Sequence, residues 1–269
     1  MNYQSENIRQ KIRNLQPLIH CITNPISIHD CANIVLAAGG RPIMAEHPAE
    51  IEEITQTADA LALNLGNITD ARMESMPKAL HTAAGNSIPV MLDLVGVACS
   101  RLRYEFAQKL MRIHMPSILK GNMSELLVMA GETAHTTGVE AGARDCLTEK
   151  NRNSLISLFQ EKAAQWNSVL LITGKEDMVV SADQCAFVRN GCETMSQITG
   201  TGCMLGMICA TYLAGSDPFS AAVWAAVEFG LAGEKAAKKS KGPGSFQTEL
   251  LDCFFLLTEK EIQEEKKLF

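Results

Sequence analysis

The chain has 269 residues, of which 46% are hydrophobic and 20% charged, and its formal net charge at pH 7 is -6. Such a chain can bury a large core, and we expect a single α/β domain over residues 1–269. The acidic balance gives no electrostatic case for binding DNA or RNA, because neutralising phosphates requires concentrated Lys and Arg, so no nucleic-acid partner is expected. The polar N-terminus lacks the apolar core of a signal peptide, and no apolar stretch reaches the ~20 residues that span a bilayer. We therefore expect a cytoplasmic protein with no membrane partner.

Short apolar segments rich in β-formers alternate along the chain with longer segments of helical period. This alternation is typical of a mainly parallel sheet covered by helices. The segments expected to form parallel strands are 18–23, 41–44, 60–65, 89–94, 117–119 and 169–173. The segments expected to form helices between them are 27–38, 49–57, 71–84, 103–114, 124–130 and 152–166.

The last third of the chain has a different pattern. Segments 177–181 and 185–189 flank a turn at Ala182 and Asp183, which predicts an antiparallel hairpin. Beyond Gly202 the apolar residues follow a helical period without an obvious strand. The helices expected there are 203–214, 218–239 and 246–267, with the loop KGPGSF between the last two.

Nine cysteines are scattered along the chain, and no two of them form a C-x-x-C pair. An odd number of dispersed thiols argues against a disulfide framework and against a structural zinc site. We expect most of them to pack as small apolar residues.

Polar residues follow several of the expected strands. Because ligands of open parallel sheets bind beyond the carboxyl ends of the strands, these residues are candidates for a functional site. On this ground we expect Asn24, Asn64 and Gly66 to bind a substrate. The other polar positions of this kind are Thr23, Asp93, Lys120 to Asn122, Thr173 and Gly174.

The segment TGTGCMLG, residues 199–206, places two glycines just before an expected helix. The dinucleotide pattern G-x-G-x-x-G requires a glycine where Leu205 stands, so NAD binding is not indicated. Gly200 and Gly202 allow a tight turn that aims successive N–H groups at one point. Together with the positive end of the helix dipole, this turn predicts a phosphate site. A glycine-rich turn that only lets the helix pack is the alternative.

Cys203 follows this loop, in the first turn of the expected helix. Helix N-termini favour the thiolate form of cysteine, so a thiol at this position suits an acceptor for the proton of a substrate hydroxyl. A small buried residue without a chemical role is the alternative.

Three further residues suit a metal ion. Asp93 stands at a strand end, where a carboxylate either holds a metal-bound water or caps the next turn. Asn122 and Glu125, three residues apart, share one helix face within reach of a hydrated Mg²⁺, although N-x-x-E is equally a capping box. Combined with the phosphate loop, and without a P-loop motif, these residues predict phosphoryl transfer outside the P-loop class.

Seven sequence blocks, in order between Pro17 and Asp252, resemble the hydroxyethylthiazole kinase family of thiamine salvage, within the ribokinase-like superfamily. They are PLIHCITNPISIHDCANIVLAAGGRPIMAEHPAEIEEI, ADALALNLG, PVMLDLVGVA, ILKGNMSEL, LITGKEDMV, ITGTGCMLG and GPGSFQTELLD. The resemblance implies a three-layer α/β/α sandwich with a mainly parallel central sheet. It also implies ATP-dependent, Mg²⁺-requiring phosphorylation of the primary hydroxyl of 4-methyl-5-(2-hydroxyethyl)thiazole, by a homotrimer with active sites between subunits.

The same resemblance implies a role for individual residues. Cys203 takes the position at which most superfamily kinases have an aspartate base. Met44 resembles the family's thiazole-contacting methionine. The anion hole is implied at Gly200, Thr201 and Gly202, with Gly200 also touching the substrate. ATP binding is implied at Lys120 and Thr173, and Mg²⁺ binding at Asp93 and Glu125.

The chain departs from the family pattern at three places. Leu94 stands where the family usually has proline, so the loop that carries Asp93 is expected to be less rigid. Lys120 stands where the family commonly has arginine, which removes the bidentate fork on phosphate. The segment NPISIHD is more polar than expected of the substrate wall, which leaves the accepted alcohol open.

Other functions stay open on the sequence alone. The nearest is a kinase for another vitamin-like alcohol, hydroxymethylpyrimidine or pyridoxal. A thiazole-binding trimer without catalysis is a second alternative. The third is an ATP-dependent dehydratase of damaged nicotinamide cofactor, which Cys203 disfavours because that class usually has aspartate there.

Overall fold

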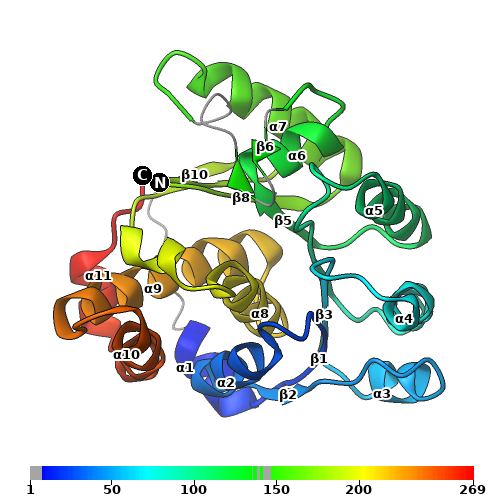
Figure 1. The fold of residues 1–269 in the computed structure, drawn as a ribbon, viewed down its shortest axis with the longest axis horizontal. Coiled ribbons are helices and arrows are strands. Elements are labelled where there is room, and N and C mark those ends of the chain that lie inside the picture. The colour runs from blue at the N-terminus through cyan, green and yellow to red at the C-terminus, as the bar shows by residue number, and fades with distance from the viewer. Residues whose placement is uncertain (1–7, 135, 138–139, 142–146) are drawn as a thin grey trace.

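A computed structural model describes residues 8–134, 136–137, 140–141 and 147–269 of the protein. Within these residues the main sheet has eight strands, in the order β10-β9-β8-β5-β4-β3-β1-β2 (Figure 1). The strands from β2 to β8 in this order run parallel to one another, and β9 and β10 form the expected antiparallel hairpin. The prediction of a mainly parallel sheet is confirmed.

The strand bounds lie close to the predicted ones. The strands of the main sheet are β1 (Leu18–Ile22), β2 (Arg41–Ile43), β3 (Ala60–Asn64), β4 (Val90–Asp93), β5 (Ile118–Asn122), β8 (Val169–Thr173), β9 (Asp177–Val180) and β10 (Cys185–Val188). A separate small ladder pairs β6 (Thr136–Thr137) with β7 (Glu140–Ala141). Strand β5 runs further than expected, through the segment KGN, because this segment continues its pairing with β8.

The helices follow the predicted alternation with the strands. They are α1 (Ile8–Leu15), α2 (Ile28–Ala38), α3 (Ile51–Gln56), α4 (Asp70–Gly85), α5 (Arg101–Ile113), α6 (Met123–Met129), α7 (Arg152–Trp166), α8 (Thr201–Leu213), α9 (Pro218–Lys239), α10 (Pro243–Leu256) and α11 (Glu259–Glu265). A short 3₁₀ helix, η2 (Glu193–Gln197), precedes α8. Helix α1 was not expected from the sequence.

The prediction of one helix over 246–267 is wrong. Helix α10 begins at Pro243, inside the expected loop, because proline fits the first turn of a helix. The chain then leaves the helical conformation at Leu257. Thr258 caps α11 in a capping box with Glu261, whose backbone N–H its side chain accepts.

Helices cover both faces of the sheet (Figure 1). Helices α2, α8, α9 and α10 pack on one face, and α3 to α7 on the other. Because strand side chains alternate in direction, Ala60 and Ala62 of β3 join the first core while Leu61 and Leu63 join the second. The predicted three-layer α/β/α sandwich is confirmed. None of the described helices has both the length and the hydropathy of a membrane span.

Candidate active site

Helix α8 begins at the carboxyl edge of the sheet. Gly200, which precedes it, has a φ of 91°, in the left-handed region that favours glycine. A Cβ at this position would lie 2.9 Å from Ser27 Cβ, so the close approach of the β1–α2 loop also requires glycine. No side chain of the described residues caps this helix start. The first backbone N–H groups of α8 are therefore available to an anion.

Thr201 is the first residue of α8, and its hydroxyl bonds the segment that precedes the helix. Its Oγ1 donates to the backbone oxygen of Met195, at 3.0 Å, and so ties the helix start to η2. The predicted anion hole at Gly200, Thr201 and Gly202 would accordingly use backbone groups at all three positions.

The Cys203 sulfur is the centre of a buried polar cluster. The cysteine is 8% exposed, and Sγ accepts hydrogen bonds from Asn24 Nδ2 at 3.4 Å and from Asn64 Nδ2 at 3.3 Å. These two asparagines follow or end the neighbouring strands β1 and β3. The sulfur is thus held from two strands, on the side where the carboxyl ends meet.

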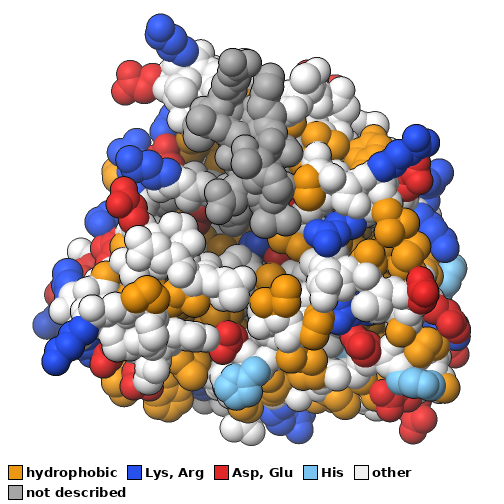
Figure 2. All heavy atoms as spheres, viewed as in Figure 1, with side chains coloured by type: hydrophobic (Ala, Val, Ile, Leu, Met, Phe, Trp, Pro, Cys, Tyr) orange, Lys and Arg blue, Asp and Glu red, His pale blue; other side chains and the backbone are white. Residues whose placement is uncertain are grey.

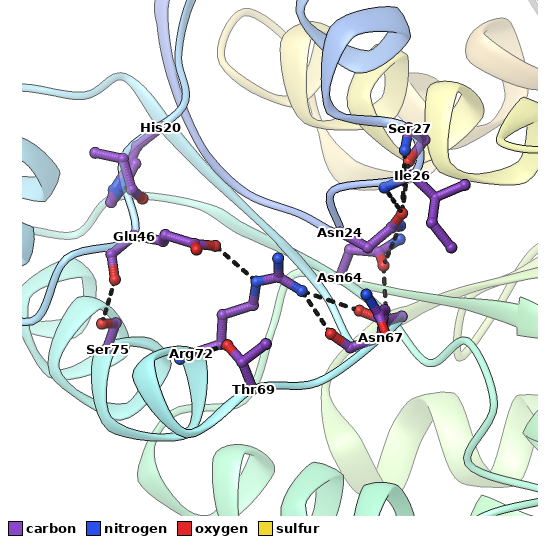
Figure 3. Close-up of polar contacts among 12 residues, drawn as sticks. His20, Asn24, Ile26, Ser27, Glu46, Asn64, Asn67, Thr69, Arg72 and Ser75 are labelled. Carbon is purple, nitrogen blue, oxygen red and sulfur yellow. Dashed lines mark hydrogen bonds and ion pairs between the residues drawn. The ribbon is translucent and has the colours of Figure 1, made fainter.

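The hydrogen bonds that the two amide oxygens accept fix the orientation of both side chains (Figure 3). Asn24 Oδ1 accepts the backbone N–H groups of Ile26 and Ser27, each at 3.1 Å, and the Ser27 hydroxyl at 3.2 Å. Asn64 Oδ1 accepts the Gly66 N–H at 2.8 Å. Because each oxygen is occupied, each NH₂ group faces the sulfur.

Gly66 packs closely against the side chains of Asn24 and Asn64. A Cβ there would lie 2.8 Å from Asn64 Oδ1 and 3.0 Å from Asn24 Nδ2, so a larger residue would displace the two amides. The structure therefore brings the expected residues Asn24, Asn64 and Gly66 together, in contact with Cys203 or with each other.

Asp93 and Lys120 form a buried ion pair in the next two strands. Strand register sets Asn64 opposite Asp93 and Asp93 opposite Lys120. Lys120 Nζ lies 2.9 Å from Asp93 Oδ2, which also accepts Asn64 Nδ2 at 3.2 Å. Burial opposes the ammonium charge, but the Asp93 carboxylate outweighs it and raises the pKa of Lys120 above its usual value.

The Lys120 ammonium lies beside the start of α8. Its Nζ is 3.7 Å from the point that a Cβ at Gly202 would occupy. Positive charge and the N-terminal N–H groups of α8 are therefore next to each other. We call Asn24, Asn64, Asp93, Lys120 and Cys203 the Cys203 cluster.

The departure at Leu94 has a structural consequence. The Leu94 N–H donates to the backbone oxygen of Lys120 at 2.8 Å, a bond that a proline at this position could not make. The loop after Asp93 lacks the fixed φ of proline but gains a hydrogen bond to β5.

Asn122 and Glu125 form the capping box at the start of α6. Asn122 Oδ1 accepts the Glu125 N–H at 2.9 Å, and Glu125 Oε2 accepts the Asn122 N–H at 2.7 Å. Glu125 Oε1 also accepts the Gly96 N–H at 2.6 Å. Burial raises the pKa of Glu125 to about 7, although these two backbone donors favour its charged form. The structure therefore contains the helix-capping box that was the alternative to a metal site at Asn122 and Glu125.

Met44 and Thr173 lie at opposite ends of the site. Met44 follows β2, where it is partly buried against the core that α2 and α8 share. Thr173 ends β8, where its Oγ1 donates to the Gly121 oxygen at 3.4 Å. Five strand spacings of ~4.8 Å separate β2 from β8, so roughly 24 Å of sheet edge lies between them. Figure 2 shows that the face drawn there is hollowed near its centre.

Two residues of this region were missed in the sequence. Ser27 has a local signal, because Asn followed three residues later by Ser is a spacing at which an Asn side chain bonds nearby backbone. Arg72, which is 2% exposed and bonds the loops after β2 and β3, has no local signal in the sequence.

Eight cysteines of the described residues are free thiols, and Cys146 lies outside these residues.

Comparison with known proteins identifies the family. The model of the Hydroxyethylthiazole kinase family matches residues 9–260. Hydroxyethylthiazole kinase 2 of Clostridium botulinum (strain Okra / Type B1) is 44% identical over 252 residues, which are 94% of this chain and 95% of that protein.

Solved structures agree with this match. The hydroxyethylthiazole kinase protein from Pyrococcus horikoshii OT3 superposes with a TM-score of 0.88 at 30% identity, over 98% of this chain and 97% of that one. A ribokinase-like superfamily protein from Enterococcus faecalis V583, at 14% identity, shares the fold with a TM-score of 0.64, over 94% of this chain and 90% of its own. The fold is therefore ribokinase-like, and the chain belongs to the hydroxyethylthiazole kinase family.

Proposed function

We propose that this protein transfers the γ-phosphoryl group of ATP to the primary hydroxyl of 4-methyl-5-(2-hydroxyethyl)thiazole, with Mg²⁺ bound. The names of its relatives support this substrate over pyridoxal, hydroxymethylpyrimidine or a role without catalysis. The observation that carries the proposal is the position of Cys203, beside an open helix N-terminus and held by two amides.

The phosphoryl group would bind at the start of α8. The backbone N–H groups of Gly200, Thr201 and Gly202 would stabilise its oxygens, as preorganised donors do in an anion hole. The Lys120 ammonium, next to Gly202, would add positive charge. ATP would extend from there toward Thr173, at the β8 end of the sheet edge.

The alcohol would bind on the other side, between Met44, Gly66 and Asn24. Its hydroxyl would meet the Cys203 sulfur. A primary alcohol is far less acidic than a thiol, so its proton leaves late, in a loose transition state governed by positioning and charge neutralisation. Cys203 would orient the hydroxyl and, as the thiolate, accept that proton to become the thiol. Asn24 and Asn64 hold the sulfur in place while it does so.

Asp93 and Glu125 are the residues that would hold Mg²⁺. Asp93 Oδ1 fits this role, because it is buried and has no hydrogen-bond partner among the described residues. Hydrated Mg²⁺ typically takes one or two carboxylates and the phosphates of its substrate. When bound, it would neutralise negative charge on the phosphates of ATP.

A homotrimer with active sites between subunits is part of the proposal, as is a cytoplasmic location.

A screen of small primary alcohols tests the function. The purified protein, ATP and Mg²⁺ would be mixed with the thiazole alcohol, hydroxymethylpyrimidine or pyridoxal, and the phosphorylated products measured. We expect the highest kcat/KM with the thiazole alcohol. Preferred phosphorylation of either other alcohol, or no transfer to any of them, would contradict the proposal.

A further inference from the structure

Two loops at the carboxyl edge carry the alcohol-binding residues proposed above. The loop after β2 begins with Met44, and the turn after β3 contains Gly66. Both lie next to the first turn of α4, from which the buried side chain of Arg72 projects between them (Figure 3).

The Arg72 guanidinium bonds both loops at once. Its Nε donates to Glu46 Oε2 at 2.7 Å, on the loop after β2. Its Nη1 donates to the backbone oxygens of Gly66, at 3.2 Å, and Asn67, at 2.8 Å, in the turn after β3. One planar cation with several donors therefore fixes the spacing of the two loops.

The segment that follows Met44 is held by further bonds. The Glu46 backbone oxygen accepts the Ser75 hydroxyl of α4 at 2.7 Å. The Ala45 backbone oxygen lies 3.0 Å from His20 Nε2, on β1. Because Ala45 and Glu46 are fixed from two sides, the position of Met44 depends on these contacts.

The turn after β3 is connected to the Cys203 sulfur by hydrogen bonds through Asn64. The peptide of Gly66 that precedes Asn67 offers its oxygen to Arg72, and the Gly66 N–H bonds Asn64 Oδ1 at 2.8 Å. Asn64 in turn donates to the Cys203 sulfur. Arg72 is thus linked through Gly66 and Asn64 to the thiol.

We propose that Arg72 is a positioning residue for the alcohol, and that the Arg72–Glu46 pair sets the width of the alcohol site between Met44 and Gly66. This inference rests on the proposed kinase function. It assigns Arg72 to the binding of the alcohol and not to the binding of ATP, whose proposed contacts lie toward the β8 end.

Arg9 offers a matched control. It is buried like Arg72, and its guanidinium also bonds one carboxylate, Glu228, and the backbone oxygens of Phe254 and Phe255. It contacts Tyr212 of α8. Tyr212 lies nine residues beyond Cys203, so at a rise of 1.5 Å per residue the two are about 13 Å apart along the helix. A buried arginine that bonds one carboxylate and two backbone oxygens is therefore also present outside the site.

The test compares Arg72→Lys with Arg9→Lys in steady-state kinetics. Lysine keeps the charge but loses the fork. For Arg72→Lys we expect the KM for the alcohol to rise about tenfold, consistent with the loss of a charge-assisted hydrogen bond, while the KM for ATP stays within about twofold. Arg9→Lys should lower the melting temperature and leave both KM values within about twofold.

Glu46→Gln keeps the test decisive if Arg72→Lys does not fold. The Glu46 side chain is 43% exposed, so its neutral variant removes the ion pair by a change at a side chain that water reaches, and the Arg72 guanidinium keeps its bonds to the backbone oxygens of Gly66 and Asn67. It should also raise the KM for the alcohol alone. An unchanged alcohol KM in Glu46→Gln, or equal rises of both KM values, would overturn the inference. If the wild type prefers another alcohol, the proposed function fails, and the same KM comparison on that alcohol still decides the role of Arg72.

Discussion

The Asn64 side-chain nitrogen lies 3.3 Å from the Cys203 sulfur and 3.2 Å from Asp93 Oδ2. One amide group therefore donates both to the thiol and to the carboxylate that pairs with Lys120. Since Asn64 also accepts the Gly66 N–H, its orientation is determined. The proposed proton acceptor and the buried charges of the site belong to one hydrogen-bonded network.

Asn64→Asp tests this network. The variant keeps an oxygen for the Gly66 N–H but places a second carboxylate oxygen against Asp93 and the Cys203 sulfur. Repulsion between the carboxylates should displace the sulfur, and we expect kcat to fall at least about tenfold because proton acceptors act only when well positioned. Steady-state phosphorylation of the thiazole alcohol measures it.

Asn190→Asp is the matched control for that variant. Asn190 Nδ2 donates to Glu234 Oε1 at 3.1 Å, and its Oδ1 accepts the Lys267 N–H at 2.7 Å, so the chemistry is the same. It follows β10, about 24 Å from β3 at five strand spacings. A loss of kcat as large in Asn190→Asp as in Asn64→Asp would mean that general destabilisation explains both.

Lys120→Met tests the buried ion pair. Removing the ammonium leaves Asp93 charged and unpaired in the core, which should lower the free energy of unfolding by about 3–5 kcal/mol. Adding Asp93→Asn to the same chain should recover part of this loss. Urea unfolding of the two variants and the wild type measures both effects. Equal stability of Lys120→Met and the wild type would show that the ion pair does not stabilise the fold.

Glu125→Gln tests the proposed Mg²⁺ site. The neutral side chain binds a cation less well, so the Mg²⁺ concentration for half-maximal rate should rise. Because Glu125 also caps α6, the control is Glu261→Gln, which disrupts the capping box of α11. The control should lose stability without moving the Mg²⁺ titration. If the titration of Glu125→Gln is also unmoved, Glu125 is only a helix cap.

His20 gives the fold a dependence on pH. Burial lowers the pKa of His20 below its usual value, although its bond to Ala45 and the charge of Glu50 oppose this shift. The unfolded chain then binds the proton more readily, so this contribution to stability is full above pH ~6.5 and is lost as the pH falls. The free energy of unfolding should drop more between pH 7 and pH 5 in the wild type than in His20→Gln. Equal drops in the two proteins would rule out this role of His20.

The sheet and most helices could be predicted because their signals are local. Alternating apolar runs marked the strands, and N-x-x-E marked the start of α6. The break at Leu257 had a local signal as well, the T-x-x-E pattern from Thr258, but the continuous helical period of 246–267 concealed it.

The Cys203 cluster could be predicted only in part. Each residue was a candidate by its place at a strand or helix end, but the bonds join positions 40 and 179 residues apart in sequence. Strand order and register bring them together, and neither was known from spacing. Arg72 lies in the first turn of a helix segment with an ordinary pattern, so nothing local distinguished it from a surface arginine.

The rate of the chemical step in Cys203→Ala tests the central claim most directly. Single-turnover phosphorylation would be measured with saturating ATP, Mg²⁺ and thiazole alcohol, together with the affinity for ATP. Loss of a positioned proton acceptor should lower the rate by ~10²–10⁴-fold, while ATP affinity changes little. A rate equal to that of the wild type would contradict the assignment of Cys203 as the group that receives the hydroxyl proton.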